Sequence, residues 1–302
     1  MITLANAPVS YGVFGLARPD LVEVPSGPRL LELVRDAGYT GIDLGAHGLL
    51  GVGQGLVDNL AEHGLALAGG WLDYPFAGDD ESFERAFLAS LPVLDDFALV
   101  ADAGLGRRPL PTIADSGSAE RKARPGGSPE LELDGERWAL FVRRLERVAQ
   151  AVRERGLEPT FHHHASTYIE TPREIERLLA DTTVDLTFDS GHLLLGGGEP
   201  DDCFRRWARR INHLHLKDAD LEILRGAQGA KDVVREVWEK KVFVALGAGD
   251  LDVAGLLDDI QAHGYDGWLV VEQDVVLLSQ DDLDAAIADQ AANRELLRRW
   301  FA

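Results

Sequence analysis

The stretch EPTFHHHASTYIETPREIERLLADTTVDLTFDSGH, residues 158–192, decides the fold. It predicts a β-strand at 158–163, a helix that begins at Pro172 and a second strand at 184–188. Thr171 suits the N-cap of this helix, proline suits its first turn, and the glutamate three residues after Thr171 completes a capping box. A strand, an amphipathic helix and a strand in this order predict two parallel strands joined by a helix.

The same alternation of short apolar runs and amphipathic stretches extends along the whole chain. Strands are expected at 2–7, 40–44, 65–72, 97–101, 158–163, 184–188, 211–216 and 268–271. Helices are expected at 29–37, 57–63, 81–91, 136–154, 172–180, 202–209, 230–240, 253–263 and 282–300. Eight βα units predict an α/β fold with a single (β/α)8 barrel domain over residues 1–302. The alternative is a doubly wound open sheet, which usually carries a phosphate-binding glycine loop after an early strand. No such loop motif follows the first strand of this sequence.

Residues 104–134 break the alternation, with Gly, Pro, Ser, Arg and Lys in mixed order. We interpret them as a long loop or lid after the fourth strand. A flexible insertion without a function is the alternative.

Composition restricts the partners. The formal net charge is −21, so the surface repels phosphate backbones, and nucleic acid is not expected as a partner. A neutral polyhydroxylated small molecule suits this charge better than a bisphosphate. Cys203 is the single cysteine, which suggests a reducing compartment. Because neither a signal peptide nor a membrane-spanning run is recognisable, we expect a cytoplasmic protein that does not bind membranes. A homo-oligomer remains open.

Strand ends carry the residues with chemistry. In a (β/α)8 barrel the active site lies at the carboxyl ends of the strands. Six of the nine histidines fall at such predicted ends, together with a glutamate after the last strand. These residues are His162, His163, His164, His192, His213, His215 and Glu272. Imidazole and carboxylate groups together are suitable ligands for Mn²⁺, Co²⁺, Zn²⁺ or Fe²⁺.

Strand alternation predicts which histidines share a face. His213 and His215 should lie on one face, as should His162 and His164, whereas His163 should point toward the helices. Each residue also has a simpler interpretation. A single histidine is often a hydrogen-bonded packing residue, an aspartate can cap a turn, and a glutamate can be a solvated loop acid. Lys217 and Asp218 could form a surface ion pair of little energetic value. It is the combination on successive strands that favours a metal site.

Six segments, taken in order, resemble the xylose-isomerase-like barrel superfamily of sugar isomerases, epimerases and dehydratases. They are NAPVSYGVF, GYTGIDLG, FHHHASTYIETPREI, FDSGHLLLGGG, INHLHLKD and GYDGWLVVEQD. The likeness is strongest to the inosose dehydratase branch and extends over essentially the whole chain. It implies one divalent metal ion, with Mn²⁺ or Co²⁺ expected first and Zn²⁺, Fe²⁺ or Mg²⁺ as alternatives.

By position, the resemblance implies Asp189, His215 and Glu272 as metal ligands. His162 falls where many relatives have glutamate, so either this histidine or water would be the fourth ligand. His192 matches a residue that contacts the substrate.

Other residues would line the pocket. His164 and Lys217 match pocket-lining positions, and His213 is expected to contact the substrate. Asp43, His47 and Trp71 would complete the wall. Trp71 could stack on a sugar face or simply pack at the barrel mouth.

The implied reaction is metal-dependent dehydration of a keto-inositol or similar polyhydroxy ketone through an enediolate. The acid and base would come from His164, His192 and Lys217, with Glu170 a weaker candidate, and their individual roles remain open. An isomerase or epimerase of sugars or keto acids is the first alternative, because the initial proton abstraction is the same.

Two more distant alternatives belong to other classes. One is a metal-dependent endonuclease for abasic DNA, which needs three metal ions and an additional Asp-x-His pair. The matching region here, LGAGDLD, lacks histidine. The other is a barrel without activity whose site has decayed.

Overall fold

Nine parallel strands of the described residues form the centre of the molecule, and two of them, β3 and β4, together take one of the eight strand positions of a barrel. In the computed structural model, which describes residues 1–302 except 125, 128, 228–229, 231–232 and 302, the sheet order is β3-β2-β1-β11-β8-β7-β6-β5-β4. The strands are β1 (Thr3–Asn6), β2 (Gly41–Ile42), β3 (Ala66–Leu67), β4 (Gly69–Tyr74), β5 (Leu110–Asp115), β6 (Thr160–His162), β7 (Asp185–Asp189), β8 (Ile211–Leu216) and β11 (Trp268–Val271). Only Ala68 separates β3 from β4. Its N–H donates to Ile42 O of β2 and its carbonyl accepts from Leu110 N of β5, so the sheet closes into a barrel. The predicted (β/α)8 fold is confirmed.

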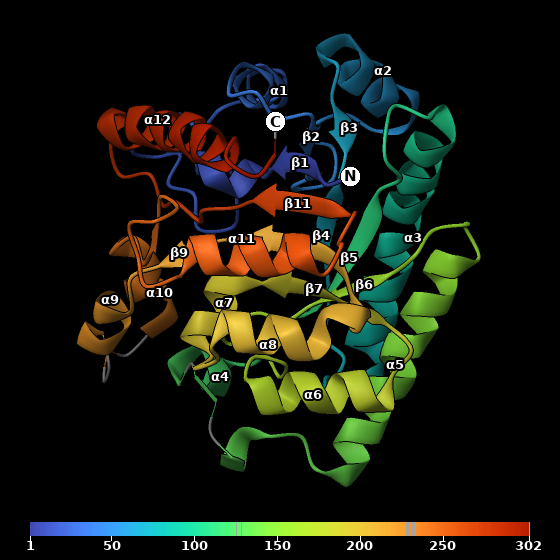
Figure 1. The fold of residues 1–302 in the computed structure, drawn as a ribbon. Helices are drawn as coiled ribbons and strands as arrows, with labels where there is room; N and C mark the ends of the chain where they lie inside the picture. Colours follow the sequence, from blue (N-terminus) through green and yellow to red (C-terminus); the bar gives the residue numbers. More distant parts are fainter. Residues whose placement is uncertain (125, 128, 228–229, 231–232, 302) are drawn as a thin grey trace.

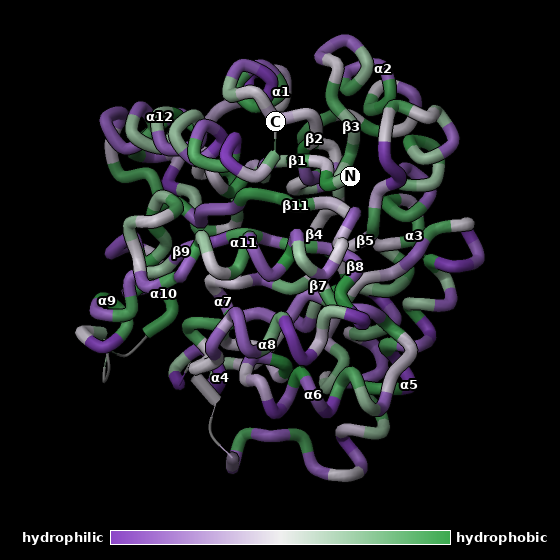
Figure 2. Tube along the Cα trace, in the orientation of Figure 1, coloured by the Kyte–Doolittle hydropathy of each residue, from purple (hydrophilic) through white to green (hydrophobic). Residues whose placement is uncertain are grey.

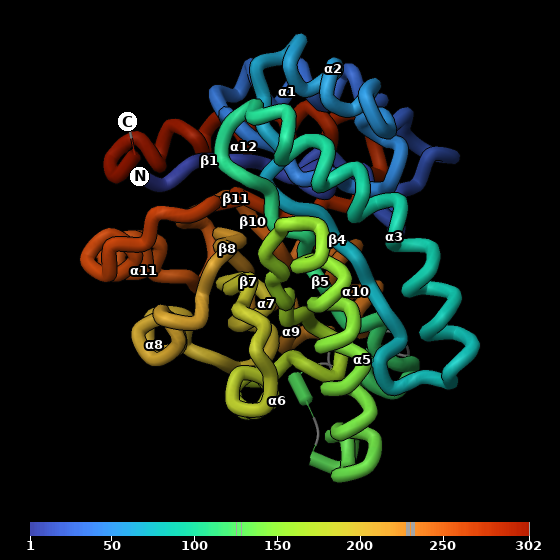
Figure 3. The backbone as a smooth tube through the Cα atoms, turned by 90° about the vertical axis from the view of Figure 1, so that its right-hand side faces the viewer, coloured from blue at the N-terminus to red at the C-terminus, as the bar shows by residue number. Residues whose placement is uncertain are grey.

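An outer layer of helices surrounds the strands (Figures 1 and 3). It consists of α1 (Gly27–Asp36), α2 (Gly53–His63), α3 (Asp80–Ala103), α5 (Gly135–Arg153), α6 (Pro172–Asp181), α8 (Pro200–Trp207), α11 (Val253–Ala262) and α12 (Gln280–Leu297). Helix α6 shows the predicted start, because Thr171 and Glu174 form the capping box and Pro172 lies in the first turn. Figure 2 shows largely hydrophobic strands and hydrophilic stretches along the outer helices. No helix of the described residues is long and apolar enough to cross a membrane.

Short elements lie at the carboxyl ends of the strands. They are α4 (Ala119–Ala123), α7 (Ser190–Leu195), α9 (Leu221–Gly226), α10 (Val233–Glu239) and the antiparallel pair β9 (Asp218–Ala219) and β10 (Phe243–Val244). Figure 1 shows α9 and α10 on the side toward which β11 points. Helix α4 contacts α10, so segments that follow β5 and β8 meet over the barrel mouth.

The expected fourth strand is wrong. Residues 97–101 form the last turns of α3, with Phe97 and Val100 buried. A short apolar run has the same composition in a buried helix as in a buried strand, and here the helix extends further than expected. The true fourth strand is β5, inside the range 104–134 that was expected to be a loop. Pro109 and Pro111 obscured it, because proline is disfavoured inside a sheet. The described residues among 116–134 still lie outside the barrel wall, and the role of this segment as a lid stays a prediction.

Candidate metal centre

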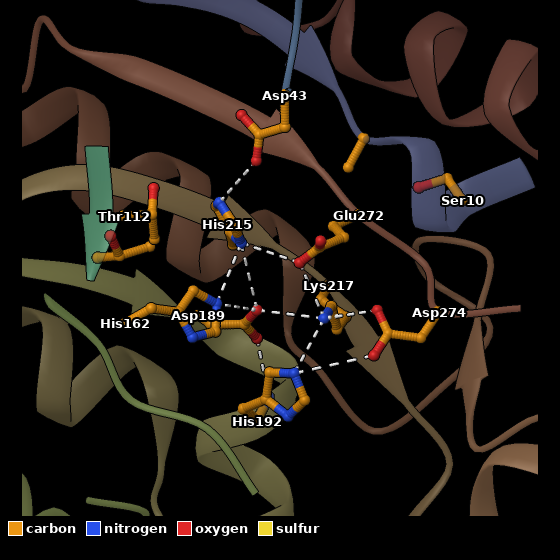
Figure 4. Close-up of polar contacts among 12 residues, drawn as sticks. Ser10, Asp43, Thr112, His162, Asp189, His192, His215, Lys217, Glu272 and Asp274 are labelled. Atoms are coloured by element: carbon orange, nitrogen blue, oxygen red, sulfur yellow. Dashed lines mark hydrogen bonds and ion pairs between the residues drawn. The ribbon is translucent and has the colours of Figure 1, made fainter. Parts of the chain in front are cut away.

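Four of the predicted residues come from neighbouring strands of the barrel. His162 ends β6, Asp189 ends β7, His215 lies on β8, and Glu272 follows β11. Register places Asp189 beside His215, and the backbone N–H of Glu272 donates to Leu216 O. Because these side chains point inward from adjacent strand ends, they meet on the barrel axis (Figure 4). One ligand atom from each lies within 4.8 Å of the others.

The spacing of the donor atoms fits a coordination shell. His162 Nε2 lies 3.2 Å from His215 Nδ1 and 3.4 Å from Asp189 Oδ2. His215 Nδ1 lies 3.7 Å from Asp189 Oδ2 and 2.8 Å from Glu272 Oε2. Four ligands at about 2.1 Å from a tetrahedral ion would be about 3.4 Å apart. Asp189 Oδ2 is buried and has no hydrogen-bond partner among the described residues. The donor set and its geometry therefore suit a divalent cation.

The two carboxylate oxygens of Asp189 face different groups. Its Oδ1 accepts a hydrogen bond from His192 N at 2.8 Å and so caps α7, while Oδ2 faces the centre. The simpler interpretation of this residue as a cap and the functional one are thus both compatible with the structure. Its backbone N–H donates to His163 Nε2, so His163 lies away from the centre, as strand alternation predicted.

Lys217 lies beside the four donors and is fully buried. Its Nζ lies 2.9 Å from Glu272 Oε2, 3.3 Å from Asp189 Oδ2 and 2.8 Å from Asp274 Oδ1. Burial lowers the pKa of Lys217, but the three carboxylates outweigh that effect and raise it above the usual value. The pKa of Lys217 is therefore shifted upward rather than depressed, which favours its ammonium form and, of the two roles expected for it, that of proton donor over base.

Two histidines form the adjoining wall. The His164 and His192 rings lie 3.7 Å apart between centroids, and His192 Nε2 accepts a hydrogen bond from Lys217 Nζ at 3.1 Å. Burial lowers the pKa of His164 to about 3, and it also holds the pKa of His192 well below its usual value. Both rings are therefore neutral at working pH. The hydrogen bond from the fully buried Lys217 orients the His192 ring directly.

The two carboxylates of the centre stay ionised. Burial alone would raise the pKa of Asp189, but the ammonium group of Lys217 holds it well below the usual range. For Glu272, Lys217 and His215 outweigh burial in the same way and lower its pKa. Ionised oxygens are the form that a cation requires.

Asp274 is the residue that sequence reasoning missed. Its carboxylate bonds Lys217 Nζ and accepts from the indole N–H of Trp238 at 3.1 Å. Burial raises its pKa to about 6. A signal existed, because Asp274 follows Glu272 by two residues and would share its face if the extended backbone continued beyond β11. Trp238 of α10 could not have been placed, since it comes from an insertion over the mouth.

Of the remaining predicted residues, some lie close to the four donor atoms and others lie away from them. Trp71 of β4 contacts the His162 and His164 rings at centroid distances of 5.4 and 5.0 Å and is 41% exposed, so it lies at the rim. His213 lies deeper in the barrel than the four donors, close to Asp43. His47 does not join the wall, because its ring pairs with Asp96 of α3 at 2.9 Å.

The fold and the cluster together define a class: a closed α/β barrel with a candidate divalent-metal centre at the carboxyl ends of its strands. The family model described as "Xylose isomerase-like TIM barrel" matches residues 31–298. The chain belongs to this family.

Two relatives and one solved structure are informative. The chain is 34% identical to the rhizopine catabolism protein MocC of Rhizobium meliloti, over 80% of this chain and 73% of the relative. It is 26% identical to an inosose dehydratase of Bacillus velezensis, over 94% of each chain. The crystal structure of the IOLI protein, whose title reports a bound zinc atom, has a TM-score of 0.68 at 14% identity and full coverage of both chains. That similarity concerns the fold.

Proposed function

We propose that this chain is a divalent-metal-dependent dehydratase acting on a keto-inositol or a similar cyclic polyhydroxy ketone. The observation that carries the proposal is the convergence of His162 Nε2, Asp189 Oδ2, His215 Nδ1 and Glu272 Oε2 within 4.8 Å, next to the ammonium group of Lys217. The similarity to proteins named inosose dehydratase supports the substrate class.

The four donors would hold one metal ion. Two imidazole nitrogens with two carboxylate oxygens suit Mn²⁺, Co²⁺, Zn²⁺ or Fe²⁺ better than Mg²⁺, which prefers an all-oxygen shell. When bound, such an ion supplies a Lewis acid that polarises the substrate ketone. His162 lies within the donor group, which supports an imidazole rather than water as the fourth ligand.

His164 is the candidate base. Its Nδ1 is 2.7 Å from Ala165 O, so Nδ1–H donates to that carbonyl and the lone pair lies on Nε2. The side chain is half-buried and lies next to the exposed Trp71 at the rim of the site, which supports access of a substrate to this ring. Because the ring is neutral, Nε2 can take the proton from the carbon next to the ketone.

Lys217 is the candidate acid. Its ammonium group would donate a proton to the hydroxyl on the next carbon, which leaves as water. The α C–H and β C–O bonds break, a C=C bond forms, and the product is the enol of a 1,2-dione. His192 lies between acid and base, 3.1 Å from Lys217 Nζ and in ring contact with His164 at a centroid distance of 3.7 Å, and would keep both in position.

The test is turnover of 2-keto-myo-inositol by the purified protein with added Mn²⁺ or Co²⁺. We expect metal-dependent absorbance of the unsaturated product and its appearance by NMR. Substrate that epimerises without loss of water would instead establish the isomerase or epimerase alternative on the same site. No conversion of either kind by metal-loaded protein would refute the proposal.

Metal content tests the ligand assignment separately. His215→Ala and Glu272→Ala should each lose stoichiometric metal by elemental analysis, since each removes one of four donors. His47→Ala is the matched control, because this histidine lies at the barrel end but pairs with Asp96 outside the cluster. Full retention of metal in both ligand variants would show that the assignment is wrong.

A further inference from the structure

Asp43 lies on the side of His215 opposite the other three candidate ligands (Figure 4). It follows β2, and its backbone N–H donates to Asn6 O of β1 at 2.9 Å, which fixes its place. Its Oδ2 lies 3.4 Å from His215 Nε2, and both side chains are more than nine-tenths buried. Among the described residues, His215 Nε2 is buried and makes no hydrogen bond, and this carboxylate at 3.4 Å is its ion-pair neighbour.

The two ring nitrogens of His215 therefore face different groups. Nδ1 points to Glu272 Oε2 and His162 Nε2, where a metal would lie, and Nε2 points to Asp43. A neutral imidazole that offers its Nδ1 lone pair to a cation carries its hydrogen on Nε2. That hydrogen then faces the Asp43 carboxylate, which can accept it.

We infer that Asp43 is a positioning residue, which fixes the tautomer and orientation of the His215 ring and so strengthens metal binding. The inference rests on the metal site of the proposed function. A carboxylate that accepts from the far nitrogen of a ligating histidine holds the ring in place and makes it a better donor, and its loss commonly costs about 10–100-fold in metal affinity.

A small polar space beneath Asp43 supports this role. A Cβ on Gly69 of β4 would lie 2.9 Å from Thr112 Oγ1 and 3.2 Å from both Asp43 Oδ1 and His213 Nε2. Three polar atoms thus crowd this position, and the second oxygen of Asp43 is one of them. Because Gly69 is not in the left-handed region, alanine can adopt its backbone conformation, and its methyl group would press on Thr112 Oγ1 and on the Asp43 carboxylate.

The inference is tested by the affinity of the folded protein for Co²⁺, measured by competition with a chromophoric chelator. Asp43→Ala should weaken binding about 10–100-fold. Asp43→Asn, which keeps an oxygen acceptor but loses the charge, should weaken it less. Both should change the visible absorption spectrum of the bound Co²⁺, which a purely structural role would leave unaltered. Gly69→Ala should also weaken binding while leaving all four ligands and Asp43 in the sequence.

Matched controls separate this effect from general damage. Asp96→Asn removes a carboxylate from the exposed pair with His47, and Gly55→Ala adds a methyl group where no atom lies within 4 Å. Both should bind Co²⁺ as the unchanged protein does. Circular dichroism confirms that each variant is folded, and Asp43→Asn serves if Asp43→Ala does not fold.

The outcomes distinguish the inference from the proposal on which it rests. If His215→Ala loses Co²⁺ binding while Asp43→Ala and Gly69→Ala bind within about twofold of the unchanged protein, the positioning role is wrong and the metal site stands. If His215→Ala also binds Co²⁺ normally, the metal site itself is wrong. Two Co²⁺ ions per chain, reduced to one by His213→Gln, would show that Asp43 is a ligand of a second ion and would overturn the inference.

Discussion

Replacing Arg121 by methionine should destabilise the segment that follows β5. The Arg121 side chain is fully buried and pairs with Glu174, and its Nη2 also donates to Leu131 O at 3.3 Å. Glu174 belongs to the capping box of α6, so this pair joins α4 to a helix of the outer layer. Methionine matches much of the arginine stem in volume but leaves a buried carboxylate without its cation.

The expected loss of stability follows from the burial of this ion pair. Removing one partner of a buried ion pair costs about 3–5 kcal/mol. With an unfolding entropy of about 2.1 cal/mol/K per residue, a chain of 302 residues loses about 5–8 °C in Tm. The assay is calorimetric unfolding at pH 8, combined with limited trypsin digestion after Lys122 beside the lost contact.

Two further variants make the result interpretable. Arg147→Met breaks a pair with Glu84 in which both side chains are almost half exposed, and it should cost at most about 1 kcal/mol. Adding Glu174→Gln to Arg121→Met should restore part of the loss, because the unpaired charge is removed. A Tm change below 1 °C for Arg121→Met, with unchanged digestion, would refute the reasoning.

Two other predictions concern Glu170 and Lys217. Burial raises the pKa of Glu170 from 4.5 to about 7, so the fold favours its protonated form. This stabilisation is complete below pH 4.5 and is lost as pH rises through 7; the unfolding free energy of the unchanged protein relative to Glu170→Gln should therefore fall by about 1 kcal/mol from pH 6 to 8. A pH-independent difference in urea unfolding would contradict this. Lys217→Met should lower kcat by about 10²–10⁴-fold while Co²⁺ remains bound, since the ammonium group is the proposed acid and not one of the four proposed ligands. Loss of the metal in this variant would reassign Lys217 to the metal site.

The carboxyl half of the barrel was predictable because its signals are local. Thr171, Pro172 and Glu174 mark the start of α6 within four residues, and the histidines and acids directly follow apolar runs. Parallel strands place their carboxyl ends at one edge, so sequence position alone brings His162 and His215 together. No long-range knowledge is needed for that step.

The prediction failed where local signals conflict and where a contact joins distant segments of the chain. Residues 97–101 are apolar because α3 buries Phe97 against the barrel, and a run of five such residues does not distinguish a helix from a strand. Arg121 and Glu174 lie 53 positions apart, and Trp238 reaches Asp274 from an insertion. Such contacts depend on how the segments between the barrel strands fold over the barrel mouth. The spacing of apolar residues in the sequence does not indicate this.

The buried charges around Lys217 explain the arrangement of the candidate metal centre. Asp189, Glu272 and Asp274 all lie within ion-pair distance of this single ammonium group, and Asp43 approaches His215 from the other side. Buried carboxylates in excess of their cations are costly unless another positive charge joins them. A divalent cation at the four donor atoms supplies that charge, and it would lie beside an ammonium group already paired to Asp274. The unfavourable burial of these carboxylates therefore occurs at the place where the proposed reaction needs a Lewis acid and a proton donor side by side.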